Sequence, residues 1–146
     1  MSTTELNKIK KYCAYQERSQ QEVRDKLYTL GLHRREVEQI ISQLVTENYL
    51  NEERFAIAYA GGKFRMKQWG KNKIKAALKQ KKVSDYCIRK ALNEINDKDY
   101  RKALDKLISE KIKAVKDENP LKKKYKVAQY IISRGFEAEL VWEKLK

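Results

Sequence analysis

The sequence is poor in the residues that interrupt helices: its 146 residues include one proline, Pro120, and only five glycines. Lysine, leucine, glutamate, alanine, glutamine and arginine are abundant instead. Glycine and proline are the residues that fit a helix interior least well, whereas the abundant residues are good helix formers. The composition therefore argues against a β fold and predicts an all-α protein.

Cysteine and histidine, which often hold metals or carry catalysis, are also scarce. Cys13 and Cys87 lie far apart, and neither has a second cysteine or a histidine at metal-ligand spacing. We interpret both as small apolar residues on buried helix faces, without a disulfide. The single histidine, His33, lies in a predicted turn, and no motif of a hydrolase or a phosphate-binding loop is present. Adjacent Glu52 and Glu53 are interpreted as first-turn acids that favour the helix dipole. We expect no catalytic residue, no metal, no cofactor and no enzymatic activity.

Long apolar runs are missing as well. No stretch approaches the roughly 20 apolar residues that span a bilayer. The first eight residues contain Glu5 and no apolar run of the kind found in secretory signals. The sequence therefore predicts a cytoplasmic protein without a membrane segment.

The apolar residues that are present recur at a fixed period. A first set of six positions returns 51 residues later, and five of these return after a further 53 residues. Such self-similarity is typical of helical repeat arrays. The three sets are Val23, Leu27, Leu32, Val37, Ile41 and Leu44; then Ile74, Leu78, Val83, Ile88, Leu92 and Ile95; then Val127, Ile131, Phe136, Val141 and Leu145.

Within each set the spacing of three and four residues places the apolar side chains on single helix faces. A further helix precedes each pair, at about residues 4–17, 52–67 and 98–117. We therefore expect about nine helices in tandem three-helix repeats at 1–50, 51–96 and 97–146, forming an elongated, curved array. Gly61 and Gly62 fall inside the second of these leading helices, where they would mark a kink or a close contact.

The links between the helices carry the expected capping residues. Ser19 with Glu22 is the pattern of a capping box, and Gly31 stands where a helix ends in a left-handed residue. Three further caps are predicted on the same grounds, at Asn48, Asn51 and Ser84.

Basic residues outnumber acidic ones by 34 to 20, which gives a net charge of +14. The excess is uneven: residues 1–50 hold 8 basic and 7 acidic residues, residues 51–96 hold 12 and 4, and residues 97–146 hold 14 and 9. A basic excess of this size predicts a polyanionic partner, either a nucleic acid or an anionic membrane surface.

The excess peaks between Lys63 and Lys82, where nine basic residues occur without a single acid. Helical geometry places Lys71, Lys75, Lys79 and Lys82 in a stripe beside the buried row of Ile74 and Leu78, where they could neutralise several phosphates. The alternative is that these lysines form an ordinary solvent-exposed helix face without a binding role, although such surfaces normally mix both signs of charge. Phe64 and Trp69 interleave the run; we favour packing over base stacking for both, as for Trp142. A weaker basic group comprises Lys122, Lys123, Lys124 and Lys126.

Four segments together resemble the RecX family of recombination regulators. RSQQEV at 18–23 is similar to the family's R-S-x-x-E-L/V opening, and YLNEERFA at 49–56 is similar to its Y-L-D-D-x-x-F-A signature. Trp69-Gly70 followed by Ile74 and Leu78 resembles W-G-x-x-K/R-I-x-x-x-L, and RGF at 134–136 resembles a K-G-F turn. The sequence departs from the family where Asn51 and Glu52 replace two aspartates and where Lys82 replaces a turn glycine.

The resemblance implies a protein of tandem three-helix repeats that is not an enzyme. Members of the family bind the RecA recombinase filament on single-stranded DNA, lie in its helical groove, and inhibit its ATPase, strand-exchange and coprotease activities. By implication this chain acts in homologous recombination, DNA repair and the SOS response, and we expect it to be a monomer. From the charge geometry, the expected contacts are Lys63, Arg65, Lys67, Lys71, Lys75 and Lys79. Two alternatives stay open: a sequence-non-specific DNA-binding module without a recombinase target, and a nuclease.

Overall fold

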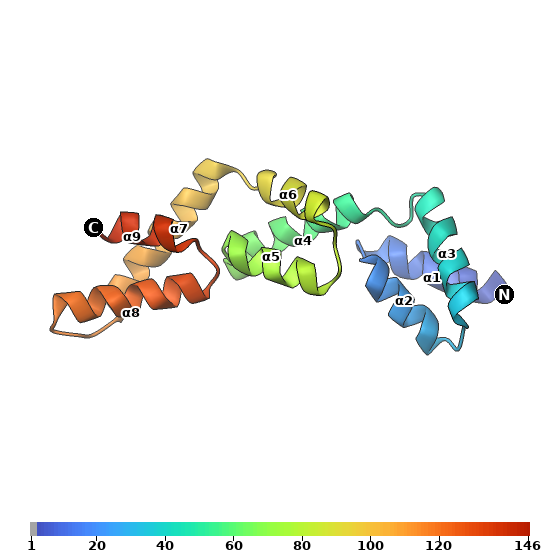
Figure 1. The fold of residues 1–146 in the computed structure, drawn as a ribbon, viewed down its shortest axis with the longest axis horizontal. Coiled ribbons are helices and arrows are strands. Elements are labelled where there is room, and N and C mark those ends of the chain that lie inside the picture. Colours follow the sequence, from blue (N-terminus) through green and yellow to red (C-terminus); the bar gives the residue numbers. More distant parts are fainter. Residues whose placement is uncertain (1–2) are drawn as a thin grey trace. The chain divides into compact units, whose positions relative to one another are not determined.

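The computed structural model describes residues 3–146, which form nine α-helices and no β-strand (Figure 1). The predicted fold class and the number of helices are therefore confirmed over that range. The helices are α1 (Thr3–Tyr15), α2 (Gln20–Thr29), α3 (Arg34–Thr46), α4 (Glu52–Lys67), α5 (Lys71–Gln80), α6 (Asp85–Asn93), α7 (Asp97–Ala114), α8 (Pro120–Ser133) and α9 (Ala138–Leu145).

Contacts between residues divide the described chain into two compact units. One unit contains residues 3–59 and 78–90, and the other contains residues 60–77 and 91–146. The boundary passes through α4, α5 and α6 and so differs from the predicted repeat boundaries at 50/51 and 96/97. The division into three repeats stays a prediction, and each unit is described on its own below.

Helices α1, α2 and α3 form a three-helix bundle in the first unit, in which α2 packs against both α1 and α3 (Figure 1). Five members of the first apolar set are buried here, and the sixth, Leu32, is partly buried against them. Both Cys13 and Cys87 are buried and unpaired, as expected. The core of the bundle comprises Ile9, Cys13, Val23, Leu27, Val37, Ile40, Ile41, Leu44 and Leu50.

The predicted caps are present in the structure. Ser19 and Glu22 form a capping box at the start of α2. Gly31 has a φ of 87° and Asn48 a φ of 65°, so both reverse the chain in the left-handed region after a helix. The side-chain oxygen of Asn51 accepts a hydrogen bond from the backbone N–H of Arg54 at 2.8 Å. Ser84 Oγ accepts one from the N–H of Cys87 at 3.3 Å.

Helix α4 runs through Gly61 and Gly62 without interruption. A Cβ atom at Gly61 would lie 2.7 Å from Nη1 of Arg65, because the Arg65 side chain lies back over that position. The close contact expected at the glycine pair is therefore present at Gly61. Apart from the adjacent backbone of α4, no atom lies within 4 Å of a Cβ at Gly62, and the structure gives no reason for glycine there.

In the second unit, α8 packs against α7 and α9 (Figure 1). Tyr100 is 1 % exposed and stacks on Phe136 with ring centroids 5.1 Å apart. The centroid of the Phe64 ring lies 5.7 Å from that of the Tyr100 ring, so the packing role predicted for Phe64 is confirmed. The buried residues of the three helices are Tyr100, Leu104, Leu107, Ile108, Val127, Ala128, Ile131, Val141 and Leu145.

Two leading helices are shorter than predicted. Helix α1 ends at Tyr15 rather than near residue 17, and α7 ends at Ala114 rather than near residue 117. After α7 the backbone becomes extended at Val115 (ψ 123°). Asp117 Oδ1 then accepts a hydrogen bond from the Asn119 N–H at 2.9 Å. Such local side-chain bonds compete with helix, so the acidic and amide residues before Pro120 end α7 early.

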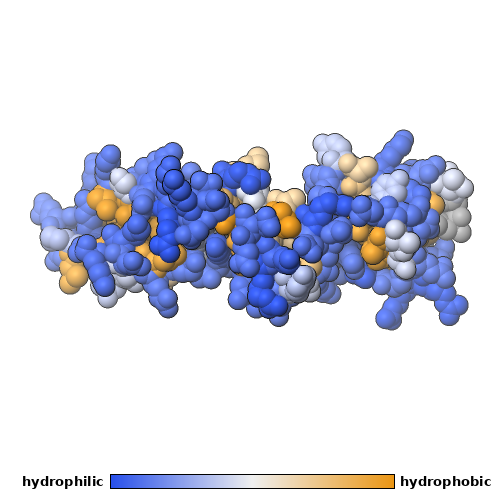
Figure 2. Space-filling view, turned by 90° about the horizontal axis from the view of Figure 1, so that it is seen from above, coloured by the Kyte–Doolittle hydropathy of each residue, from blue (hydrophilic) through white to orange (hydrophobic). Residues whose placement is uncertain are grey.

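Most of the surface seen from above is hydrophilic, with small hydrophobic patches between hydrophilic residues (Figure 2). Trp142 is 36 % exposed and meets the Tyr125 ring edge-on at 5.3 Å, which agrees with the packing role expected for it. None of the helices formed by residues 3–146 is both long and apolar enough to cross a membrane.

Candidate nucleic-acid interface

Helix α5 carries Lys71, Lys75 and Lys79 at four-residue intervals, and we call these three residues the α5 ridge. The helix sets them apart from Ile74 and Leu78, which are both 0 % exposed. Lys75 and Lys79 are exposed, whereas Lys71 is half-buried with its ammonium group 4.9 Å from the centre of the Tyr100 ring. The apolar face of α5 thus fixes the direction of the ridge. Lys82, the fourth member of the predicted stripe, does not belong to it, because α5 ends at Gln80 and Lys82 lies in the following turn with a φ of 63°.

The predicted contact residues on α4 do not share one face of the helix. Residues four apart on a helix lie above one another, so Lys63 and Lys67 lie on one side. Arg65 lies on another side, over Gly61, and both Arg65 and Lys67 are exposed. Lys63 is half-buried, with its ammonium group 5.1 Å from the centre of the Trp69 ring. The prediction grouped these three residues by charge, but the helix separates them.

Few carboxylates oppose the basic run. Lys81 forms an ion pair with Glu22 at 3.8 Å. Across residues 3–146, no carboxylate oxygen lies within 4.0 Å of the side-chain nitrogens of Arg65, Lys67, Lys75, Lys79 or Lys82. Unopposed, exposed cations attract polyanions at long range and release counterions when they bind phosphate.

The turn before the ridge is clamped by the turn between α8 and α9. The Gly70 N–H donates to Arg134 O at 2.8 Å, and the Asn72 N–H donates to Gly135 O at 2.9 Å. The guanidinium of Arg134 also joins the two turns, because it donates to the carbonyl oxygens of Lys67 and Gln68. A Cβ atom at Gly70 would lie 2.2 Å from Phe136 N, so only glycine lets the two backbones approach this closely.

Tyr100 holds the first residue of the ridge. Its hydroxyl accepts a hydrogen bond from the Lys71 N–H at 3.0 Å and donates one to the Glu137 carboxylate. Burial, and then the bond to Glu137, raise the pKa of Tyr100, so the hydroxyl stays protonated and can donate. Because the N–H groups of Lys71 and Asn72 are both used, the start of α5 offers neither of them to an anion.

Trp69 is half-buried, between the end of α4 and the start of α5. Besides Lys63, the ammonium group of Lys73 lies over its ring, 4.6 Å from the centroid. Cation–π contacts of this kind hold two lysines on the aromatic surface. Lys73 is one of the nine basic residues of the run but is not among the predicted contacts. Its position four residues after Trp69 was the sequence feature that could have pointed to its contact with the ring.

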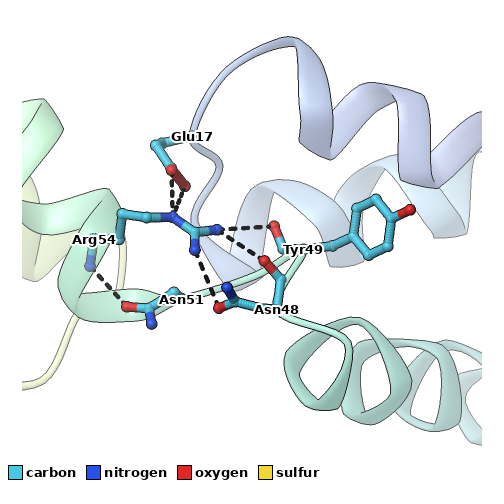
Figure 3. Close-up of polar contacts among 5 residues, drawn as sticks. All are labelled: Glu17, Asn48, Tyr49, Asn51 and Arg54. Carbon is cyan, nitrogen blue, oxygen red and sulfur yellow. Dashed lines mark hydrogen bonds and ion pairs between the residues drawn. The ribbon is translucent and has the colours of Figure 1, made fainter.

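Arg54 was missed altogether by the sequence analysis, although it organises the first unit (Figure 3). Its Nε donates to the Glu17 carboxylate at 2.7 Å, and its two terminal nitrogens donate to Asn48 Oδ1 and Asn48 O, both at 3.1 Å. One guanidinium thus joins the α1–α2 link, the α3–α4 link and α4. The closure of α3 by Asn48 depends on this contact as well as on its own left-handed backbone.

Glu52, Glu53 and His33 all lie at the starts of helices. Glu52 and Glu53 lie in the first turn of α4, as predicted, and Glu52 also accepts a hydrogen bond from the Ser84 N–H at 2.7 Å. His33 precedes α3 at its N-cap position. No group of three or more His, Cys, Asp or Glu side chains suited to a metal occurs between residues 3 and 146.

The second basic group opens α8, behind Asn119 and Pro120. The Asn119 side chain accepts hydrogen bonds from the N–H groups of Leu121 and Lys122. Lys126 forms an ion pair with Asp117 at 2.9 Å. This group is therefore partly neutralised and is a weaker candidate interface than the α5 ridge.

Two models of one protein family match this chain. The model of the first three-helix domain of RecX matches residues 6–44, and the model of its second three-helix domain matches residues 51–92. Regulatory protein RecX of Clostridium tetani is 30 % identical over 131 residues, which cover 88 % of this chain and 58 % of that protein. Regulatory protein RecX of Streptococcus uberis is also 30 % identical, over 89 % of this chain and 50 % of that protein. The chain spans about half the length of these curated relatives.

Solved structures show the same fold. The crystal structure of RecX from Lactobacillus salivarius superposes with a TM-score of 0.88, at 24 % sequence identity, over 98 % of this chain and 93 % of that one. A second crystal structure of a regulatory protein RecX gives a TM-score of 0.87 at 20 % identity. The resemblance and the all-helical repeat fold expected from the sequence are confirmed.

Proposed function

Because this chain belongs to the RecX family of regulatory proteins, we propose that it regulates homologous recombination and DNA repair by binding the RecA filament on single-stranded DNA. In this proposal it inhibits the ATPase, strand-exchange and coprotease activities of the filament. It acts as a cytoplasmic monomer, without a cofactor and without chemistry of its own.

The observation that supports the proposal most directly is the exposed, unopposed charge of the α5 ridge. Lys75 and Lys79 are exposed one helical turn apart, and neither has a carboxylate partner among residues 3–146. Lysines in this arrangement can contact successive phosphates of a strand without reading its bases. Such binding suits a regulator that acts on a filament of any DNA sequence.

The contact surface is proposed to include all six predicted residues, Lys63, Arg65, Lys67, Lys71, Lys75 and Lys79. They do not contribute equally. Lys75 and Lys79 serve as direct contacts, whereas Lys63 and Lys71 lie over the rings of Trp69 and Tyr100 and also stabilise the fold. Arg65 faces another side of α4 and would contact a different part of the polymer.

The test is a titration of RecA-driven ATP hydrolysis on single-stranded DNA, at two salt concentrations. We expect the wild-type protein to slow hydrolysis below equimolar ratios, and Lys75→Glu/Lys79→Glu to abolish most of this effect. Lys102→Glu/Lys106→Glu is the matched control, because Lys102 and Lys106 are exposed and four residues apart on α7. It makes the same change in net charge and should inhibit like the wild type. Unchanged hydrolysis at equimolar wild-type protein would contradict the proposal.

Two alternatives are separated by binding and cleavage assays. A sequence-non-specific DNA-binding module would bind naked DNA and the RecA filament equally, whereas we expect a clear preference for the filament. A nuclease would cut labelled DNA in the presence of Mg²⁺ or Mn²⁺, and we expect intact DNA.

A further inference from the structure

A pocket of about 460 Å³ lies between α1 and α2, away from the α5 ridge in the sequence. Four cations line it: Lys8 and Lys11 from α1, Arg18 from the link, and Lys26 from α2. Tyr12 and Tyr15 complete its sides. On α1, positions 8, 11, 12 and 15 fall on one helical face, so a single face supplies two cations and two aromatic rings.

This concentration of positive charge contrasts with the near neutrality of residues 1–50, which hold 8 basic and 7 acidic residues. Half of those basic residues line the one pocket. Two of the acids are paired with cations outside it: Glu47 pairs with Lys10 at 3.4 Å, and Glu38 pairs with Arg24 at 2.8 Å. Among the pocket cations, Arg18 has a carboxylate nearby, that of Glu22 at 3.9 Å.

The aromatic wall of the pocket is held in place before any ligand arrives. The Arg18 guanidinium lies over the Tyr12 ring, 3.8 Å from its centroid, and Nε of Arg18 donates to Tyr12 O at 3.1 Å. The Lys26 ammonium group lies 5.7 Å from the same ring. The same guanidinium also lies over the Tyr15 ring, at a longer 6.0 Å from its centroid. Tyr15 is nevertheless 83 % exposed at the end of α1, so most of its ring is open to a partner.

We propose that this pocket is a second binding site for single-stranded nucleic acid, in which Lys8, Lys11 and Lys26 contact phosphates and the Tyr15 ring stacks on an unpaired base. An acidic peptide would use the cations but would leave the exposed ring unused, whereas a nucleotide uses both. The volume lies within the range of about 300–1,000 Å³ that is typical of ligand pockets. The inference rests on the proposed binding of single-stranded DNA, and it adds a binding surface far along the chain from the α5 ridge.

The phosphate contacts are tested by fluorescence anisotropy with a dye-labelled oligothymidylate, over a range of salt concentrations. Lys8→Ala/Lys11→Ala should weaken binding and reduce the slope of log affinity against log salt by about 1.4, because each phosphate of a single strand that a cation neutralises contributes about 0.7 to that slope. Arg34→Ala/Arg35→Ala removes the same charge from exposed positions of the same bundle and should leave the slope near the wild-type value. Arg18 is left unchanged because it also supports the fold.

The stacking contact is tested by Tyr15→Ala, with Tyr28→Ala as its control, since Tyr28 is 45 % exposed and does not line the pocket. Tyr15→Ala should weaken oligothymidylate binding about five-fold or more, and should leave binding to an abasic oligonucleotide unchanged. Poly-glutamate should compete poorly at the same ionic strength.

The results separate this inference from the proposed function. If the wild type binds oligothymidylate and only the α5 ridge variant is weakened, the pocket inference is overturned and the proposed function stands. If the pocket variants are weakened equally on thymidylate and on poly-glutamate, the pocket is an acidic-peptide site and the inference is overturned as well. If the wild type binds no single-stranded DNA, both fail.

Discussion

Replacing Gly70 with alanine should destabilise the second unit by about 3–5 kcal/mol. The new Cβ would lie 2.2 Å from Phe136 N and 2.3 Å from Gly135 C, which are backbone atoms that cannot rotate away. The two turns would have to separate, which breaks the Gly70–Arg134 and Asn72–Gly135 hydrogen bonds. Overpacking typically costs about 1–3 kcal/mol, and each broken hydrogen bond adds about 1 kcal/mol.

The measurement is urea-induced unfolding followed by far-UV circular dichroism, with the fluorescence of neighbouring Trp69 as a second probe. Gly62→Ala is the control, because it makes the same chemical change inside α4, where no atom except the adjacent helix backbone lies within 4 Å of the new Cβ. It should raise the unfolding free energy by about 1 kcal/mol, since alanine is the better helix former. A Gly70→Ala protein within about 0.5 kcal/mol of the wild type would refute the reasoning, because surface substitutions without special contacts fall in that range.

Three further predictions concern the first unit. Arg54→Lys should lower the unfolding free energy by roughly 1–2 kcal/mol, because one ammonium group cannot replace the planar donors that reach Glu17 and Asn48; unchanged denaturant midpoints would contradict this. Lys82→Gly should raise stability by about 0.5–1 kcal/mol, because Lys82 has a φ of 63° that glycine adopts without steric cost, and a decrease in stability would show that the turn needs the lysine side chain. Burial raises the pKa of the Cys13 thiol to about 11. The buried, protonated Cys13 thiol therefore contributes fully to the unfolding free energy below the pKa of the unfolded thiol, and this contribution is lost as the pH rises from about 9 to 11. The unfolding free energy of Cys13→Ala should fall less steeply over the same pH range.

Much of the fold follows from local rules that the sequence displays. All positions of the three repeated sets except Leu32 and Leu92 are buried, because apolar residues spaced three and four apart share the helix face that packs inward. Ser19, Gly31, Asn51 and Ser84 cap their helices as predicted, because a cap depends mainly on its own turn of chain. Asn48 also closes α3 as predicted, but with added support from Arg54. Even the departure at Lys82 is informative: a lysine in the position of a turn glycine keeps the left-handed backbone of that turn.

The contacts that position the candidate interface are less accessible from sequence. The Gly70–Arg134 hydrogen bond joins residues 64 positions apart, and no local pattern shows that these two turns meet. The Arg54 cluster depends in the same way on two links that converge on α4. The position of Arg65, however, was predictable. Each residue of a helix turns by about 100°, so Arg65, two residues from both Lys63 and Lys67, points to another side of α4, and grouping the three by charge overlooked that geometry.

Charge sums along the chain hide how charge is distributed on the surface. Residues 1–50 sum to +1, a value typical of a segment with no preference for a polyanion. Folding brings Lys8, Lys11, Arg18 and Lys26 around one pocket, while Glu38 pairs with Arg24 and Glu47 pairs with Lys10, two cations that do not line it. A nearly neutral segment can therefore present a cationic pocket, because electrostatic attraction falls steeply beyond about 10 Å at moderate salt and a ligand responds to its neighbours rather than to the sum. The same reasoning favours the α5 ridge as the stronger candidate surface, because no carboxylate oxygen of residues 3–146 lies within 4.0 Å of the Lys75 or Lys79 ammonium group.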